Sequence, residues 1–189
     1  MSTRTSESTT IEIRPVCPTD RAELSRFYAS LSADSRYARF LATSRGITDH
    51  AAESFCGLDH EHREGLVAIA SLPDRSAQIV GHLCLDPLED SAFEMAVAVA
   101  DGWRGQGIGR RLLNEAIDWA SQHGIAQLRA TMLATNIPIL ALIRSTGRTV
   151  VVTSPDCGVI EAQISIAPSA NAASANAASA NAALVNAAA

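Results

Sequence analysis

A glycine-rich segment that follows a short apolar run constrains this chain more than any other feature. The sequence VADGWRGQGIGRRLL, Val99 to Leu113, holds four glycines within eight residues. The apolar run before it, 93–100, predicts a central strand covered on both faces. An amphipathic pattern then begins near Gly107 and ends at Gly124, which predicts a helix. Because glycine adopts backbone conformations closed to other residues, the loop between strand and helix can turn its amides inward around an anion.

The spacing of these glycines excludes two familiar phosphate-binding loops. Gly102 and Gly107 have the separation of a P-loop, but Ile108 and Gly109 stand where that motif needs Lys and Ser or Thr. A dinucleotide-binding fingerprint needs Gly-x-Gly-x-x-Gly, whereas Gly105, Gly107 and Gly109 give Gly-x-Gly-x-Gly. The acidic residue that such a fingerprint has about twenty residues on is also missing. The loop therefore belongs to a different class of anion site.

Hydrophobic periodicity along the chain predicts an α/β (α+β) domain. Asp20, with Glu23 three residues on, is expected to cap the first helix through its side chain. Ile79 is expected to share one face of its strand with Leu83 and Leu85. The predicted order is a strand at 10–16, two or three helices within 20–58, a strand hairpin over 65–87, a strand at 93–100, a helix at 107–124, a strand at 126–133, a helix at 137–146 and a hairpin over 149–166.

Composition and charge limit the classes of partner and compartment. The chain has 189 residues, 47% of them apolar, which suffices for one sizeable core. A net charge of −5 and a pI near 5.5 argue against nucleic acid as a partner. The N-terminus is polar and no apolar run reaches the roughly eighteen residues of a membrane span, so we expect a soluble cytoplasmic protein. The four cysteines form no cluster, which predicts free thiols and no metal site.

Two shifts in composition predict the domain boundaries. Residues 1–9 are polar and are expected to form a flexible N-terminus, and residues 10–166 carry every periodic element. From residue 167 the pentapeptide SANAA occurs three times in succession, with only Leu184 and Val185 as sizeable apolar residues. Such a sequence can bury little surface to offset the entropy of ordering. We therefore expect 167–189 to be a disordered tail.

Within this frame, the loop resembles that of the GCN5-related N-acetyltransferase (GNAT) family. Arg104, Gly107 and Gly109 form an Arg-x-x-Gly-x-Gly motif directly after a strand and at the start of a helix, and the resemblance extends over about 11–166. It implies a twisted, mostly antiparallel sheet of six to seven strands flanked by about four helices. It also implies acetyl-CoA as co-substrate, no metal, and a monomer or homodimer.

The resemblance assigns the contacts to acetyl-CoA to three segments. The motif loop would wrap the pyrophosphate, and the strand before it would bind the pantetheine arm and the acetyl oxygen. Asn136 would touch the cofactor arm, although a helix-capping role explains this residue nearly as well. The implied cofactor-binding residues are Val97, Ala98, Val99, Arg104, Gly105, Gln106, Gly107, Ile108, Gly109, Arg110 and Asn136.

The same resemblance names Glu94 as the general base. Its segment, AFEMAVAV, looks like the Ala-Glu-x-Ala-x-x-Val of bacterial protein-lysine acetyltransferases, with one inserted residue. A solvent-facing glutamate at a strand start is the alternative. SRYARF, Ser35 to Phe40, is similar to a segment of the same branch, which implies a protein lysine as acceptor. One departure is Ile143, since many family members have a tyrosine there as general acid for the leaving thiolate.

Two other functions remain open from the residues. The first is acetylation of a small amine of the polyamine or aminoglycoside type, for which the acidic residues Asp86, Glu89 and Asp90 lie near the expected cleft. The second is a catalytically silent acyl-CoA-binding regulator, which the absence of a tyrosine at Ile143 makes conceivable and the presence of Glu94 disfavours.

Overall fold

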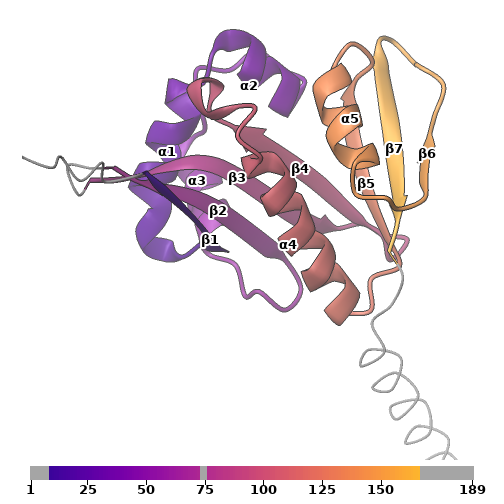
Figure 1. The fold of residues 1–189 in the computed structure, drawn as a ribbon, viewed down its shortest axis with the longest axis horizontal. Coiled ribbons are helices and arrows are strands. Elements are labelled where there is room, and N and C mark those ends of the chain that lie inside the picture. Colours follow the sequence, from indigo (N-terminus) through magenta and orange to yellow (C-terminus); the bar gives the residue numbers. More distant parts are fainter. Residues whose placement is uncertain (1–8, 73–75, 167–189) are drawn as a thin grey trace, which may run out of the picture.

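The computed structural model describes residues 9–72 and 76–166, and the predictions for the two chain ends lie outside these residues. The predicted order of elements is confirmed, with three helices after the first strand (Figure 1). In chain order the elements are β1 Thr10–Pro15, the 3-10 turn η1 Pro18–Asp20, α1 Arg21–Ser30, α2 Ala33–Phe40, α3 Asp49–Cys56, β2 Glu64–Ser71, β3 Ala77–Pro87, β4 Phe93–Val99, the 3-10 turn η2 Asp101–Trp103, α4 Ile108–Gln122, β5 Gln127–Leu133, α5 Ile137–Arg144, β6 Val150–Val152 and β7 Val159–Ser165.

One seven-stranded sheet organises the described residues, in the order β1-β2-β3-β4-β5-β7-β6. Every neighbouring pair is antiparallel except β4 and β5, which are parallel. The mixed, mostly antiparallel sheet predicted from the sequence is confirmed. Five α-helices flank it in place of about four, because the third helix over Asp49–Cys56 also forms.

The sheet carries a hydrophobic core on each face. The larger core lies between the sheet and α4, whose buried stripe is Ile108, Leu112, Leu113, Ala116, Ile117 and Ala120. The smaller core lies under α1 and α3 and includes Leu24, Phe27 and Tyr28. Figure 1 shows α4 crossing the sheet on one side with α1 and α3 on the other. The amphipathic pattern of α4 thus fixes which face of the helix packs on the sheet.

The prediction that Ile79 shares a face with Leu83 and Leu85 is wrong. The pairing of β2 with β3 shifts register between Ala68 and Ile69, because Ala68 pairs with Gly81 while Ile69 pairs with Ile79. This bulge adds one residue to β3 and turns Ile79 to the opposite face. Ile79 therefore packs in the core under α1, whereas Leu83 and Leu85 pack in the core under α4.

Asp20 is the N-cap of α1, as predicted, but its side chain does not cap this helix. Asp20 makes no side-chain hydrogen bond to the start of α1. Its carboxylate instead accepts from the backbone N–H of Cys17 at 2.9 Å and from both terminal nitrogens of Arg14 at 2.7 and 2.8 Å. The hydrogen bonds from Arg14 hold the pKa of Asp20 at about 2. The carboxylate therefore caps the 3-10 turn before the helix and ties it to β1.

Gly81 sets how closely α4 approaches the sheet, and this generates a first prediction. A Cβ at position 81 would lie 2.9 Å from Leu112 Cδ1 and 3.2 Å from Ile108 Cγ2. We expect Gly81→Ala to lower the free energy of unfolding by about 1–3 kcal/mol, since overpacking pushes the helix away. Urea unfolding measures this loss. Gly102→Ala is the control, because its Cβ would meet nothing within 4 Å; equal stability of both variants would contradict the packing argument.

Candidate active site

The site begins where β4 and β5 stop pairing. The two parallel strands are in register only at Phe93 with Leu128 and Glu94 with Arg129, and they diverge from there. The rest of β4 therefore has a neighbour on one edge only. The strand was predicted to be covered on both faces, but it is half-buried from residue 96 onward, because the divergence opens a groove beside it.

The divergence leaves backbone amides of β4 facing the groove. Ala100 N–H donates to the carbonyl of Val80 on β3 at 2.9 Å. Because alternate residues of a strand point their amides to the same side, Ala98 also bonds toward β3. The amides of Val97 and Val99 then point toward the gap between β4 and β5. These are the two positions at which an extended ligand could be bound as if it were a further strand.

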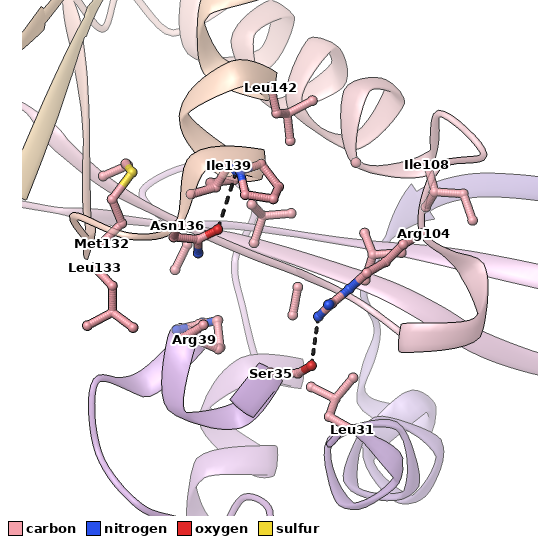
Figure 2. A pocket seen from close by; sticks show the side chains of 18 of the residues that line it. Leu31, Ser35, Arg39, Arg104, Ile108, Met132, Leu133, Asn136, Ile139 and Leu142 are labelled. Carbon is pink, nitrogen blue, oxygen red and sulfur yellow. Dashed lines mark hydrogen bonds between the residues drawn. The ribbon is translucent and has the colours of Figure 1, made fainter. Parts of the chain in front are cut away.

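The groove has a volume of about 690 Å³ and is walled by β4, the glycine loop, α2, β5 and α5 (Figure 2). Gln106 is the one predicted cofactor-binding residue that does not line it. Its side chain instead lies over the loop, with Nε2 3.4 Å from the carbonyl oxygen of Gly102. The predicted residues that do line the groove are Val97, Ala98, Val99, Arg104, Gly105, Gly107, Ile108, Gly109, Arg110 and Asn136.

The glycine loop has the geometry of an anion site. Gly105 and Gly107 have φ of +74° and +79°, which favour glycine, and a Cβ at either position would meet nothing within 4 Å. Gly107 is the N-cap of α4, and the first intrahelical bond is donated by Arg111 N–H to the Gly107 carbonyl at 3.1 Å. The amides of Ile108, Gly109 and Arg110 are therefore free at the positive end of the helix dipole. A diphosphate fits this environment.

Arg104 is held in place from α2. Its Nη2 donates to Ser35 Oγ at 2.7 Å and lies 3.2 Å from a carboxylate oxygen of Asp101. Asp101 in turn accepts from the backbone N–H of Ser32 at 2.8 Å and from Ser35 Oγ at 2.5 Å. Figure 2 shows the bond between Arg104 and Ser35 crossing the groove. One carboxylate thus ties the N-terminus of α2 to the loop that carries the arginine.

Glu94 lies in a second, smaller pocket of about 300 Å³ that adjoins the groove. Its side chain is exposed at the start of β4. Apolar walls from Phe40, Leu41 and Phe55 surround the opening. Four residues line both cavities, namely Arg39, Met95, Ala96 and Thr131. The carboxylate therefore stands beyond one end of the groove, with a small pocket in front of it.

Two of the other three acidic residues near this pocket are already paired. Asp86 accepts from Arg63 Nε at 2.6 Å, and Asp90 forms an ion pair with Arg129. Glu89 is exposed and lines neither cavity. Glu94 is thus the one of these four carboxylates that lines the smaller pocket and carries no described ion pair.

The structure also shows the local roles of two residues, one at the N-cap of α5 and one within this helix. Asn136 is the N-cap of this helix, and its side-chain oxygen accepts from Ile139 N–H at 3.4 Å while the residue lines the groove. Ile143 is fully buried in the larger core and offers no proton donor. A tyrosine-like general acid is therefore absent from this position of the described chain.

A family model and several solved structures agree with this geometry. A model described as "Acetyltransferase (GNAT) family" matches residues 25–147. Acetyltransferase PA5475 of Pseudomonas aeruginosa is 25% identical over 124 residues, 66% of this chain and 67% of that protein. The GNAT domain of S. lividans PAT superposes with a TM-score of 0.71 at 23% identity, over 82% of this chain and 90% of that one. The structure of yncA from Salmonella typhimurium with its cofactor acetyl-CoA gives 0.69 at 21% identity, over 85% and 96%.

Because the family match spans more than half of the chain, the protein belongs to the GNAT family of acetyltransferases. It is an acetyl-CoA-dependent N-acetyltransferase. The resemblance drawn from the Arg-x-x-Gly-x-Gly loop is confirmed in family, fold and co-substrate. Across 9–72 and 76–166, no cluster of three or more His, Cys, Asp or Glu side chains is arranged to hold a metal. No helix among these residues is long and apolar enough to cross a membrane.

Sequence reasoning missed the contribution of α2 to the site. Ser35 and Arg39 stand four residues apart, so they lie on one face of the helix, and both line the groove. From the family resemblance, SRYARF indicates the acceptor, and none of these side chains is assigned to the cofactor groove. Its signal for a site is the i, i+4 spacing of two polar residues next to the apolar Leu31, which also lines the groove.

Asp101 generates the second prediction. Burial alone would raise the pKa of Asp101, but hydrogen bonds from Ser35 and Ser32 and the charge of Arg104 outweigh it, so the pKa is lowered. A lowered pKa in the folded state stabilises the protein above the unfolded-state pKa, and this stabilisation is lost as pH falls through the folded-state pKa. We expect Asp101→Asn to lower the free energy of unfolding by about 1 kcal/mol at neutral pH.

Thermal unfolding followed from neutral to acid pH tests this. The gap in Tm between wild type and Asp101→Asn should narrow as the pH falls. Asp34→Asn provides the comparison, because Asp34 is an exposed carboxylate in the first turn of the same helix. If the difference in Tm between wild type and Asp101→Asn stays constant down to acid pH, the charge of the Asp101 carboxylate does not hold α2 to the loop.

Proposed function

We propose that the protein transfers the acetyl group of acetyl-CoA to the side-chain amine of a protein lysine, with Glu94 as general base. One observation carries this proposal: the two cavities adjoin and share four lining residues, and Glu94 lies in the smaller cavity. An acceptor entering the smaller pocket would meet the acyl end of a cofactor in the groove. We also propose that the catalytic domain spans 10–166.

Our proposed cofactor contacts follow the groove from the loop to β4. The free amides at 108–110 and the side chains of Arg104 and Arg110 would bind the pyrophosphate. The amides of Val97 and Val99 would bind the pantetheine arm and the acetyl oxygen, which supplies donors where negative charge develops. Asn136 would contact the arm while it caps α5. Gln106 would contribute its backbone alone, since its side chain does not line the groove.

Glu94 would act on the amine that attacks the thioester. The side-chain amine of lysine has a pKa of about 10 and is mostly protonated at neutral pH. A base that removes the proton is therefore needed before the nitrogen can attack. The nitrogen forms a bond to the carbonyl carbon, the proton passes to Glu94 or through it to water, and the carbon–sulfur bond breaks with its electron pair on sulfur. Because Glu94 is exposed and without a described ion pair, its carboxylate is free to take that proton.

The shape of the smaller pocket favours lysine over a polyamine. Phe40, Leu41 and Phe55 give apolar walls that suit a chain of methylenes, with one carboxylate at the end. A polyamine or aminoglycoside carries several positive charges, and it would need several unpaired carboxylates. Asp86 and Asp90 do not meet that need, because arginines already pair with them. A lysine with a single charge matches Glu94, the one unpaired carboxylate among the described residues that line the smaller pocket.

The third prediction is a loss of turnover without a loss of cofactor binding in Glu94→Gln. The amide keeps shape and hydrogen bonding but has no basic site, and general-base assistance contributes about 10²- to 10⁴-fold. We expect kcat with a lysine peptide to fall at least about tenfold at neutral pH. Part of the loss should be recovered as the pH rises and more amine is neutral. Acetyl-CoA should still raise the Tm of the variant.

Glu89→Gln is the matched control, because it removes an exposed carboxylate that lines neither cavity. Its turnover should equal that of wild type. If Glu94→Gln keeps near-full activity across the pH range, Glu94 is not the base. If polyamines are acetylated and lysine peptides are not, the acceptor class proposed above is wrong.

A further inference from the structure

The junction between the two cavities holds a cation that the proposed reaction has not yet used. Of the four residues that line both cavities, Met95 and Ala96 are apolar, so Arg39 and Thr131 provide the polar side chains. The inference below rests on the proposed function, since it concerns the sulfur that leaves when the amine attacks. That sulfur needs a stabilising group, because the buried Ile143 cannot donate a proton.

Arg39 reaches the junction from the last turn of α2. Ser35, one turn earlier, binds Arg104 at the pyrophosphate end of the groove. In Figure 2, Arg39 on α2 lies below Asn136 and to the right of Leu133, while Arg104 lies beside Ile108 at the other end. The two arginines therefore flank the length of groove in which the pantetheine arm would lie.

The sheet register places Arg39 one step closer to the cofactor than Glu94. Arg39 Nη2 lies 3.2 Å from Cys84 Sγ. Cys84 pairs across the sheet with Ala96, whereas the neighbouring pair on the same face is Asp86 with Glu94. Successive pairs on one face are about 7 Å apart along a strand. The cation thus stands beside β4 between the base and the groove.

The protein holds this guanidinium without neutralising it. Its charge lies 5.0 Å from the ring centre of Phe40 and 5.9 Å from that of Phe55, both in cation–π range. Its Nε is buried and has no hydrogen-bond partner among the described residues. The nearest carboxylate on β3, Asp86, is bound by Arg63. The Arg39 guanidinium is thus fixed in place with an unused donor and no paired carboxylate, which points to a ligand that supplies the missing acceptor.

The titratable groups beneath the guanidinium do not carry a compensating charge. Burial raises the pKa of the Tyr28 hydroxyl on α1 to about 12 and lowers that of His82 on β3 to about 3. These two side chains bond to each other at 2.7 Å and both are neutral. Burial likewise raises the pKa of Cys84, which stays a thiol. Of the carboxylates among the described residues that line the smaller pocket, Asp86 is bound by Arg63, and Glu94 on β4 is unpaired.

We propose that Arg39 is a catalytic residue that stabilises the negative charge on the CoA sulfur as the carbon–sulfur bond breaks. The electron pair of that bond passes to sulfur, the nitrogen–carbon bond of the product forms, and the amine proton leaves through Glu94. The guanidinium faces the developing thiolate and lowers its energy by charge and hydrogen bonding. Water protonates the thiolate after product release. Arg39 thereby replaces a tyrosine acid with a fixed charge.

The test is the pKa of the thiol of bound CoA, followed by the ultraviolet absorbance of its thiolate. Protein saturated with desulfo-CoA, which lacks the thiol, is the reference for each variant. We expect the thiol in the wild-type complex to titrate at least about one pH unit below free CoA, as an opposite charge within about 4–6 Å produces. Arg39→Lys should keep most of this lowering, and Arg39→Gln should abolish it.

Two further variants locate the effect. Arg104→Gln, measured at saturating CoA, removes an equal charge from the far end of the groove and should leave the thiol pKa lowered. Thr131→Val removes the other polar side chain of the junction and should also leave it lowered. A second readout is the ratio of the affinities for CoA and desulfo-CoA. In the wild type this ratio should rise with pH as the bound thiol ionises, and in Arg39→Gln it should not rise.

A wild-type complex whose thiol titrates like free CoA would overturn the proposal, and this requires no variant to fold. The proposal also fails if Arg39→Gln keeps the lowered pKa, or if Thr131→Val abolishes it. The outcome is separable from that of the proposed function. Inactivity toward every lysine peptide, with a lowered thiol pKa, would refute the acceptor while the role of Arg39 toward sulfur would stand.

Discussion

The loss of pairing between β4 and β5 is the constraint on which the rest of the site depends. Two parallel strands that stay in register for only two residue pairs must leave backbone groups without partners beyond that point. In β4 these are the amides of Val97 and Val99, since the alternate amides bond to β3. An unpaired strand edge in the middle of a sheet is a cost that a bound ligand can offset by supplying hydrogen bonds. The groove, the loop at its end and the pocket beside it all follow from this opening.

Two kinds of contact hold the elements around the opening. Charged hydrogen bonds join α2 to the glycine loop, and close packing joins α4 to the sheet. Asp101 binds the N-terminus of α2 and Arg104 together, so helix and loop form one wall. Gly81 lets α4 lie close to β3, and the first residues of this helix, 108–110, line the groove. Burial of Tyr28 and His82 supports the far end, where Arg39 stands. The site is therefore positioned by side chains that do not themselves meet an acceptor.

Local patterns in the sequence were sufficient for the elements and for the loop. The stripe of α4 and the Arg-x-x-Gly-x-Gly spacing depend on neighbours along the chain, and both are confirmed. Three predictions failed where the outcome depends on contacts between strands or turns. Ile79 changed face because of a bulge, Asp20 turned to Arg14, and β4 lost its cover where β5 diverges.

The second pocket could not be predicted for the same reason. Its walls come from α2, α3, β3, β4 and β5, which are far apart in sequence. The acidic residues Asp86 and Asp90 looked available in the sequence, but Arg63, just before β2, pairs with Asp86 and Arg129 of β5 pairs with Asp90. The i, i+4 spacing of Arg39 with Ser35 indicates a shared helix face but not the proposed role of Arg39, because that role depends on lying beside the Cys84–Ala96 pair.

Amide hydrogen exchange with and without acetyl-CoA tests the central claim most directly, because it reads the backbone groups that the opening leaves unpaired. At saturating acetyl-CoA we expect slower exchange at Val97, Val99 and the amides of 105–110, with no change in the hairpin of β6 and β7. Protection that falls elsewhere, with exchange at Val97, Val99 and the loop unaltered, would contradict the assignment of this groove to the cofactor.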